Sequence, residues 1–168
     1  MTAPRVRLEP PRTATRALRG LATGLRSPAD GWLLARMLAW RAVLPALKRG
    51  LPLPRLVRLM AAPPSGRGRD HRREASIVDL ADRVYGHRRA GNGCLERSLV
   101  AYRYLARAEA DPALVIGVRH GEGDPRAHAW VVVDGDAIHD AAASLAVFAP
   151  VAMFRSDGTL EEGRDARS

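Results

Sequence analysis

The sequence predicts an α+β protein in which helices come first and a small antiparallel sheet follows. Apolar residues recur at helical spacing as far as residue 105. From residue 114 onward they form short, β-branched runs bounded by turn residues. At 168 residues, the chain has the length of one domain, or of one small domain with an appendage.

The first helix is expected to begin at Ser27 and to run to about residue 47. Serine followed by a proline, with an acid three residues after the serine, is a typical helix start. The stretch is apolar almost all round, and only Arg36 and Arg41 interrupt it. Burying both arginines in a bilayer would cost roughly 2.5–3.5 kcal/mol each. We therefore expect a buried or membrane-surface helix and not a membrane span.

Three more helices are predicted before the sheet. Residues 52–60 have a short basic amphipathic pattern, and residues 61–73 are rich in proline, glycine and arginine, which is typical of a linker. Ser76 with Asp79 forms a second capping box, which predicts a helix start there. The last helix follows Gly93 and carries its apolar residues on one face.

Residues 114–118 and 127–133 predict two strands, and a turn separates the second from a third strand at residues 137–140. The expected domain organisation is a basic helical region with its linker at residues 1–73, a folded domain at residues 74–155 and a disordered tail at residues 156–168.

Charge is distributed unevenly along the chain. Residues 1–73 hold 16 Lys and Arg against 3 Asp and Glu, a net charge of +13, whereas residues 74–168 have a net charge of −4. The cations are almost all arginine, which codon bias can produce, and few aromatic residues are interleaved with them. We therefore predict no nucleic-acid partner.

The chain has a single cysteine, Cys94, where the turn Gly91-Asn92-Gly93 leads into a helix. Unpaired N–H groups in a first helical turn favour a thiolate and can hold an oxyanion. Asn92 can cap this helix and leave the thiol free, although free cysteines are often only small buried hydrophobes. One cysteine forms no disulfide within the chain, and residues 1–26 contain no secretory signal, so we expect a cytoplasmic protein.

His128 and Asp140 are the candidate base and orienting carboxylate. A histidine in a strand is more often structural, but small alanines flank His128 and leave room for a substrate. A two-residue Asp134-Gly135 turn would put His128 and Asp140 on opposite faces of the sheet. A three-residue loop would make them diagonal neighbours, roughly 7–8 Å apart. The catalytic hypothesis thus predicts a three-residue loop or an equivalent bulge.

The remaining polar residues suggest no further chemistry. His139 is expected to face away from Asp140 in a structural or exposed position, and Ser98 to pack beside the cysteine helix. One cysteine and scattered histidines lack metal-ligand spacing, so no metal is predicted. The absence of a phosphate loop and of a dinucleotide fingerprint leads us to predict no cofactor.

The motif Cys94-Leu95-Glu96-Arg97-Ser98-Leu99, the strand at 114–118, the run His128-Ala129-Trp130-Val131 and Asp140 resemble the transglutaminase-like leader peptidases of lasso-peptide biosynthesis, of the microcin-processing type. The resemblance covers about residues 75–150. It implies a papain-like, transglutaminase-like core, with a helix bearing the cysteine packed on an antiparallel sheet.

The resemblance further implies that the enzyme removes the leader from a ribosomally made precursor peptide. Cys94 matches the family nucleophile, His128 the base and Asp140 the orienting acid, and Trp130 and Asn92 are the predicted substrate-binding residues. The implied partners are the precursor peptide, a separate leader-binding recognition protein (PqqD-like) and an ATP-dependent macrolactam cyclase. No cofactor is implied.

Other interpretations stay open at this point. The domain can transfer the acyl group to an amine instead of water, or it can be a non-catalytic peptide-binding scaffold. The basic region at residues 1–73 can dock a partner or the precursor, contact a membrane surface through its helices, or form the solvated outside of helices packed on the core.

Overall fold

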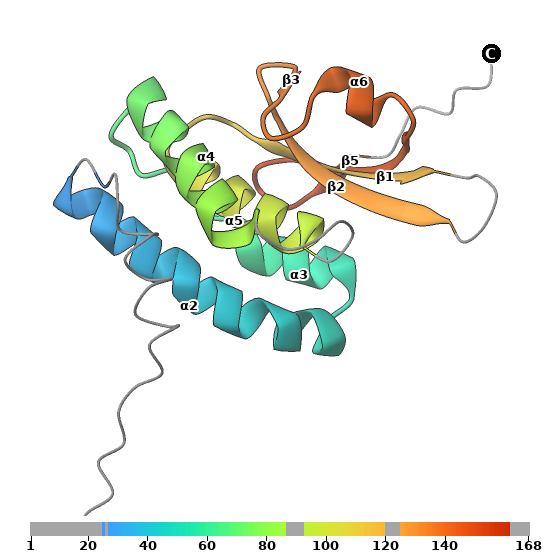
Figure 1. Cartoon of the computed structure of the whole chain (residues 1–168), viewed down its shortest axis with the longest axis horizontal. Helices are drawn as coiled ribbons and strands as arrows, with labels where there is room; N and C mark the ends of the chain where they lie inside the picture. The colour runs from blue at the N-terminus through green and yellow to red at the C-terminus, as the bar shows by residue number, and fades with distance from the viewer. Residues whose placement is uncertain (1–24, 26, 87–92, 120–124, 162–168) are drawn as a thin grey trace, which may run out of the picture.

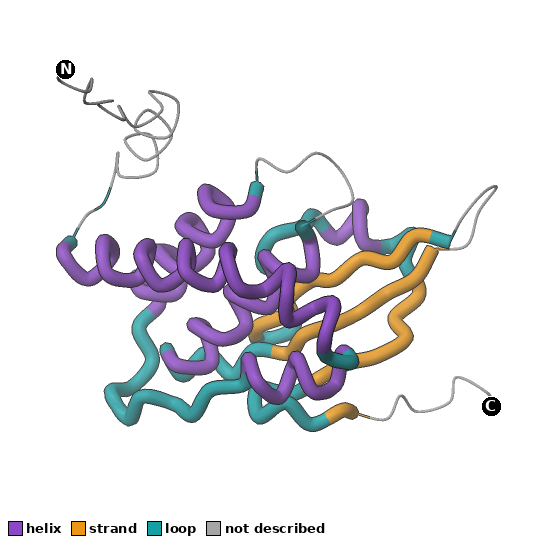
Figure 2. Tube along the Cα trace, turned by 90° about the horizontal axis from the view of Figure 1, so that it is seen from below, coloured by secondary structure: helices purple, strands orange, loops and turns teal. Residues whose placement is uncertain are grey.

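The structure is a computed structural model that describes residues 25, 27–86, 93–119 and 125–161. The helices that precede the sheet in the chain gather on one side of a five-stranded antiparallel sheet (Figures 1 and 2). The strand order is β3-β2-β1-β4-β5. The predicted α+β architecture, with helices ahead of an antiparallel sheet, is confirmed.

The two N-terminal helices lie where the sequence predicts them. Helix α2 (Pro28–Gly50) begins after Ser27, whose side chain accepts a 3.2 Å hydrogen bond from the N–H of Asp30. It continues three residues beyond the predicted end at residue 47. Helix α3 (Leu53–Met60) buries one apolar face. No helix in the described part of the chain is long and apolar enough to cross a membrane.

Helix α4 (His71–Tyr85) begins five residues before the predicted start at Ser76. Its cap is Asp70, whose carboxylate accepts hydrogen bonds from the N–H groups of Arg72 and Arg73. The predicted linker is therefore shorter, because an aspartate cap satisfies the first-turn donors ahead of the serine.

Helix α5 (Cys94–Arg107) is the central helix of the fold, with the sheet on one side and the other helices around it (Figure 1). It is buried almost all round, including the polar side chains of Glu96 and Ser98. The residue at its N-cap position is Gly93, which provides no side-chain hydrogen bond. The predicted cap, Asn92, lies outside the described residues.

The sheet is formed by β1 (Ala113–Arg119), β2 (Arg126–Val133), β3 (Asp136–Ala137), β4 (Ala149–Phe154) and β5 (Leu160–Glu161). A short helix, α6 (Ala142–Leu145), joins β3 to β4. Strand β5 pairs with β4, so the fold continues past residue 155, where the sequence predicts a disordered tail. Residues 162–168 of that tail lie outside the described residues.

The prediction of a three-residue loop between β2 and β3 is wrong. Val133 pairs with Asp136, which leaves Asp134 and Gly135 as a two-residue turn. Both turn residues have positive φ, 53° and 91°, the sign that a type I′ hairpin turn requires at each position. The aspartate–glycine pair is a common sequence for this turn, and its twist matches that of the flanking strands.

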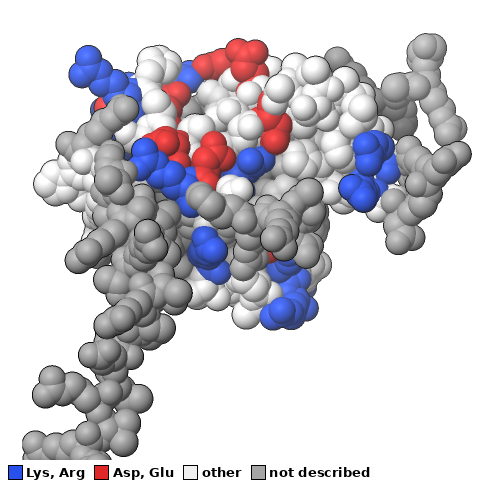
Figure 3. Space-filling model, viewed as in Figure 1, with Lys and Arg blue, Asp and Glu red and all other residues white. Residues whose placement is uncertain are grey.

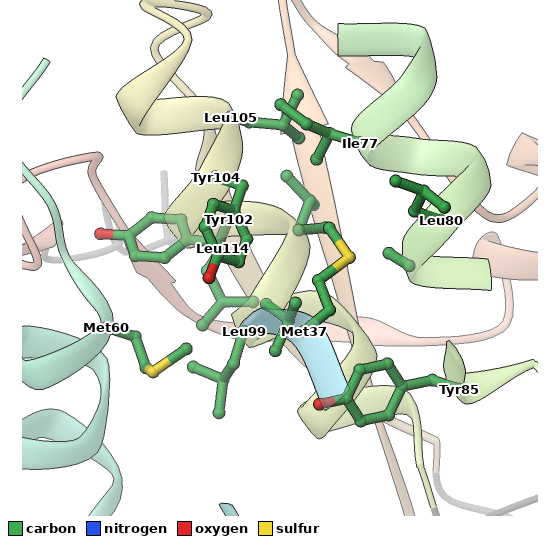
Figure 4. Close-up of a cluster of buried hydrophobic side chains, with 14 of the residues drawn as sticks. Met37, Met60, Ile77, Leu80, Tyr85, Leu99, Tyr102, Tyr104, Leu105 and Leu114 are labelled. Carbon is green, nitrogen blue, oxygen red and sulfur yellow. The ribbon is translucent and has the colours of Figure 1, made fainter. Parts of the chain in front are cut away.

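One hydrophobic core connects the helices and the sheet. Figure 4 shows Met37 of α2 and Met60 of α3 beside side chains of α4 and α5 and Leu114 of β1. The core therefore runs across residue 73, and the predicted boundary there does not separate two cores. Where Figure 3 shows described residues, basic and acidic side chains lie next to one another.

Candidate active site

A pocket of about 560 Å³ lies where the start of α5 meets β2 and the segment after β3. Cys94, His128 and Asp140 all line it, together with Arg97, Arg119, Arg126 and Phe148, among others. The structure therefore brings the three predicted catalytic residues to one cavity, although they lie on a helix, a strand and a loop that are separate in sequence.

Cys94 is the first residue of α5, and its side chain is partly exposed at the pocket. This position agrees with the sequence analysis, which places the thiol in the first helical turn. The N–H groups of a first turn have no partner within the helix, so they point out of the helix beside the sulfur. The alternative from the sequence, that Cys94 is only a small buried hydrophobic residue, does not fit its position in the wall of the pocket.

His128 and Asp140 form a direct pair, with Nε2 of the imidazole 3.2 Å from Oδ2 of the carboxylate. Both side chains are about one-fifth exposed. A carboxylate at Nε2 places the proton of the neutral ring there and leaves the lone pair on Nδ1. Nδ1 is therefore the ring nitrogen that can accept a proton from a thiol.

Asp140 reaches His128 because the chain leaves the sheet just before it. The N–H of Ile138 still donates to the carbonyl of Val131, at 3.0 Å, and residues 138–140 then bend. The alternation of side chains that would separate the pair in a continuous strand no longer applies after this bend. The predicted strand at 137–140 is thus limited to Asp136–Ala137, and the pair forms despite the two-residue turn.

Arg97 is the site residue that the sequence analysis missed. Its Nη2 lies 2.8 Å from Oδ2 of Asp140, and its Nη1 lies 3.5 Å from Oδ1 of Asp82 on α4. It follows Cys94 by three residues, which places both side chains on one face of α5. The three-residue spacing from Cys94 was the sequence signal that could have indicated Arg97. Helix periodicity alone, however, does not show which carboxylate an arginine contacts.

His139 is structural, one of the two outcomes that the sequence analysis allowed. Its side chain has no exposed surface, and Nδ1 lies 3.1 Å from Oδ1 of Asp82 without the alignment of a hydrogen bond. Burial alone would raise the pKa of Asp82, but the neighbouring His139 and Arg97 outweigh it and hold that pKa below its ordinary value.

Aromatic rings flank the imidazole of His128. Phe148 stacks on it with 5.1 Å between ring centroids, and Trp130 lies at 6.1 Å. Trp130 is only 6 % exposed and is not among the residues that line the pocket. Its predicted contact with substrate stays a prediction, whereas its packing beside the imidazole is observed.

One of three comparisons with known proteins gave a match. The family model of the transglutaminase-like superfamily matches residues 33–153, which is more than two-thirds of the chain. The chain belongs to the transglutaminase-like superfamily. The match begins within α2 and ends within β4, so the N-terminal helices are part of the region that this transglutaminase-like protein shares with its family. No curated protein and no solved structure gave a significant match.

Superfamily membership supports a cysteine peptidase or an acyltransferase type of activity for this transglutaminase-like protein. Both reactions proceed through a thioester on a cysteine and need a base beside it. Within residues 25, 27–86, 93–119 and 125–161, no group of three His, Cys, Asp or Glu side chains is placed to hold a metal ion. Cys94 and His128 supply the pocket with a thiol and an imidazole.

Proposed function

We propose that the protein is a cysteine peptidase that removes the leader from a ribosomally synthesised lasso precursor peptide. The observation that carries this proposal is the His128–Asp140 pair, 3.2 Å apart, in the same pocket as Cys94. Cys94 lines this pocket and is partly exposed, as attack on a peptide substrate requires. The resemblance of the cysteine and histidine motifs to the leader peptidases supports the choice of substrate.

In the proposed reaction, Nδ1 of His128 takes the proton of Cys94, and the sulfur attacks the carbonyl carbon at the leader–core junction. The N–H of Cys94, in the first turn of α5, is a candidate donor to the developing oxyanion. His128 then protonates the amine of the core peptide as the C–N bond breaks. Water, activated by the same imidazole, hydrolyses the thioester and releases the leader.

Cys94 and His128 do not need to touch before the substrate binds. Among the described residues, the polar side chain that contacts the imidazole is that of Asp140. Hydrogen bonds between catalytic groups are often long in the free enzyme and shorten in the complex. Asp140 keeps the imidazole in the tautomer that the reaction needs, as the carboxylate does in serine and cysteine hydrolases.

The proposed partners are the precursor peptide, a separate leader-binding recognition protein of the PqqD-like type and an ATP-dependent macrolactam cyclase, acting in the cytoplasm. Helices α2 and α3 pack into the same core as the helix that carries Cys94.

The test combines the protein with a synthetic precursor peptide encoded beside its gene, with and without the neighbouring leader-binding protein, and follows the products by mass spectrometry. Wild type should cleave at one position, and Cys94→Ala should abolish cleavage while circular dichroism shows an intact fold. His128→Ala should give a similar loss and Asp140→Asn a smaller one. Full cleavage by Cys94→Ala would refute the proposal.

The same assay separates the two alternatives. In water enriched in ¹⁸O, a peptidase places the label in the new carboxyl group of the leader. An acyltransferase instead joins the leader to an added amine, which changes the product mass. A scaffold gives neither product, and its Cys94 should react with iodoacetamide no faster than an ordinary free thiol.

A further inference from the structure

One guanidinium joins two histidine–carboxylate pairs in this fold. Nη2 of Arg97 contacts Oδ2 of Asp140 at 2.8 Å, and His128 approaches the same oxygen at 3.2 Å. On the other side, Nη1 of Arg97 lies 3.5 Å from Oδ1 of Asp82, and His139 approaches that oxygen at 3.1 Å. Asp140, Arg97 and Asp82 thus connect the pocket to helix α4, and His139 lies against Asp82.

The middle of this connection is largely removed from solvent. The Arg97 side chain is 16 % exposed and that of Asp140 is 19 % exposed, whereas Asp82 at the outer side is 46 % exposed. A charge at such a depth is stable only with a well-placed partner, because desolvation costs several kcal/mol per ion. Two carboxylates on opposite sides therefore fix the guanidinium in one position.

The backbone groups of Asp140 itself take no part in the hydrogen bonds of the described backbone. Its segment lies beyond β3, and no backbone–backbone hydrogen bond involves Asp140 within the described part of the chain. Its carboxylate is instead contacted by two side chains, those of Arg97 and His128. Arg97 donates the shorter of the two hydrogen bonds that Asp140 receives, and it comes from α5, the helix that also carries Cys94.

We propose that Arg97, itself held by Asp82, is a positioning residue that keeps Asp140 aligned with His128. Arginine suits this place because its planar fork can meet two carboxylates at fixed angles, which the point charge of lysine cannot do. Asp82 acts one step further from the pocket, by pairing with the other edge of the guanidinium. The proposal rests on the proposed cysteine chemistry of Cys94 and His128.

The test uses p-nitrophenyl acetate, so that it does not depend on the identity of the peptide. The Cys94 sulfur attacks the acetyl carbon, the C–O bond to p-nitrophenolate breaks and a thioester forms. Water then releases acetate and restores the thiol. The rate constant for nitrophenolate release is measured for wild type, and Cys94→Ala supplies the background to subtract.

The decisive measurement is a double-mutant cycle. Arg97→Met should slow the reaction roughly 10- to 100-fold, the loss typical when a partner that orients an active-site ligand is removed. In an Asp140→Asn background, the same Arg97→Met change should have little further effect on the rate, because the carboxylate that Arg97 positions is already absent. Equal effects in both backgrounds would overturn the proposal, since Arg97 would then act independently of Asp140.

A second comparison uses two aspartates on α4. Asp82→Asn should slow the reaction in the same direction as Arg97→Met. Asp79→Asn is the matched control, because Asp79 is similarly exposed and pairs with Arg83, one helical turn away, instead of Arg97. If both variants lower the rate equally, the effect comes from helix stability and the role assigned to Asp82 is wrong.

Chemical rescue distinguishes positioning from folding. Guanidinium ions, added far below denaturing concentrations, should restore part of the activity of Arg97→Ala and leave wild type unchanged. If Arg97→Met or Arg97→Ala does not fold, Asp82→Asn replaces it in the cycle with Asp140→Asn. A wild type no faster than Cys94→Ala refutes the proposed function, whereas an active wild type with an additive cycle refutes only the role of Arg97.

Discussion

Ser98 Oγ donates a 2.8 Å hydrogen bond to the carbonyl oxygen of Ala129, the residue that follows His128 along β2. Ser98 lies four residues after Cys94 on α5, and it has no exposed surface. The bond therefore ties the helix that carries the thiol to the strand that carries the imidazole. The packing role expected of Ser98 from the sequence is what the structure shows.

Replacing Ser98 with alanine should weaken both the fold and the site. The change removes one buried hydrogen bond, which contributes about 0.5–1.5 kcal/mol to the free energy of unfolding. The rate with p-nitrophenyl acetate should fall as well, because the helix and the strand lose a direct connection. Urea denaturation measures the first effect. Ser76→Ala, on the partly exposed side of α4, is the control and should change neither quantity.

Gly117→Ala should disturb the aromatic surroundings of His128. A Cβ atom at this position would lie 2.7 Å from Cη2 of Trp130 and 3.0 Å from Cβ of Phe148, and both residues flank the imidazole. Overpacking of this kind costs about 1–3 kcal/mol of unfolding free energy. Thermal unfolding and the ester assay measure the outcome.

Gly50→Ala is the matched control for this substitution. No heavy atom lies within 4 Å of a Cβ built there, and Gly50 is the last residue of α2, where alanine is the better helix former. Its stability should be unchanged or slightly higher. Equal stability of the two alanine variants would show that the Gly117 site has room for a side chain.

The ion pair between Lys48 and Glu96 should stabilise the fold because it gives the buried carboxylate of Glu96 a cation. Nζ of Lys48 lies 2.7 Å from Oε1 of Glu96, whose side chain is 4 % exposed, whereas the lysine is 44 % exposed. Lys48→Met leaves the buried carboxylate without its cation, which should lower the free energy of unfolding by about 1–3 kcal/mol. Adding Glu96→Gln should recover part of this loss in urea denaturation. Equal stability of Lys48→Met and wild type would contradict the prediction.

Stability should fall in strongly alkaline solution because of Tyr102. Burial, the largest cause, raises the pKa of Tyr102 to about 12, above the value of about 10 for an exposed tyrosine. The folded state thus keeps the phenol neutral while the unfolded state ionises. The stabilisation is complete below pH 10 and is lost as the pH rises through 12, up to about 2–3 kcal/mol.

This prediction is checked by measuring the free energy of unfolding between about pH 9 and pH 12. That range, about three pH units, is set by the two pKa values. Tyr102→Phe should be less stable at neutral pH, because the hydroxyl donates to the carbonyl oxygen of Arg155. It should also lose stability less steeply above pH 10, since the titrating group is absent. A slope as steep as that of wild type would assign the alkaline loss to other groups.

Local signals in the sequence were sufficient for most helices and for the two long strands. The serine–proline start of α2 and the apolar runs of β1 and β2 act over a few residues, and the structure reproduces them. The start of α4 was misplaced because two capping signals compete there, and Asp70 comes before Ser76. Strands β4 and β5 were not predicted from residues 149–161.

By itself, the sequence determined the order of the helices and of β1 and β2, the place of Cys94 at the start of a helix and the candidates His128 and Asp140. Only the tertiary structure decided how the last two meet. The chain leaves the sheet after Ile138, so strand parity no longer governs Asp140, and Arg97 from another element contacts its carboxylate. Periodicity describes residues a few positions apart, whereas this contact depends on how α4, α5 and the sheet pack together.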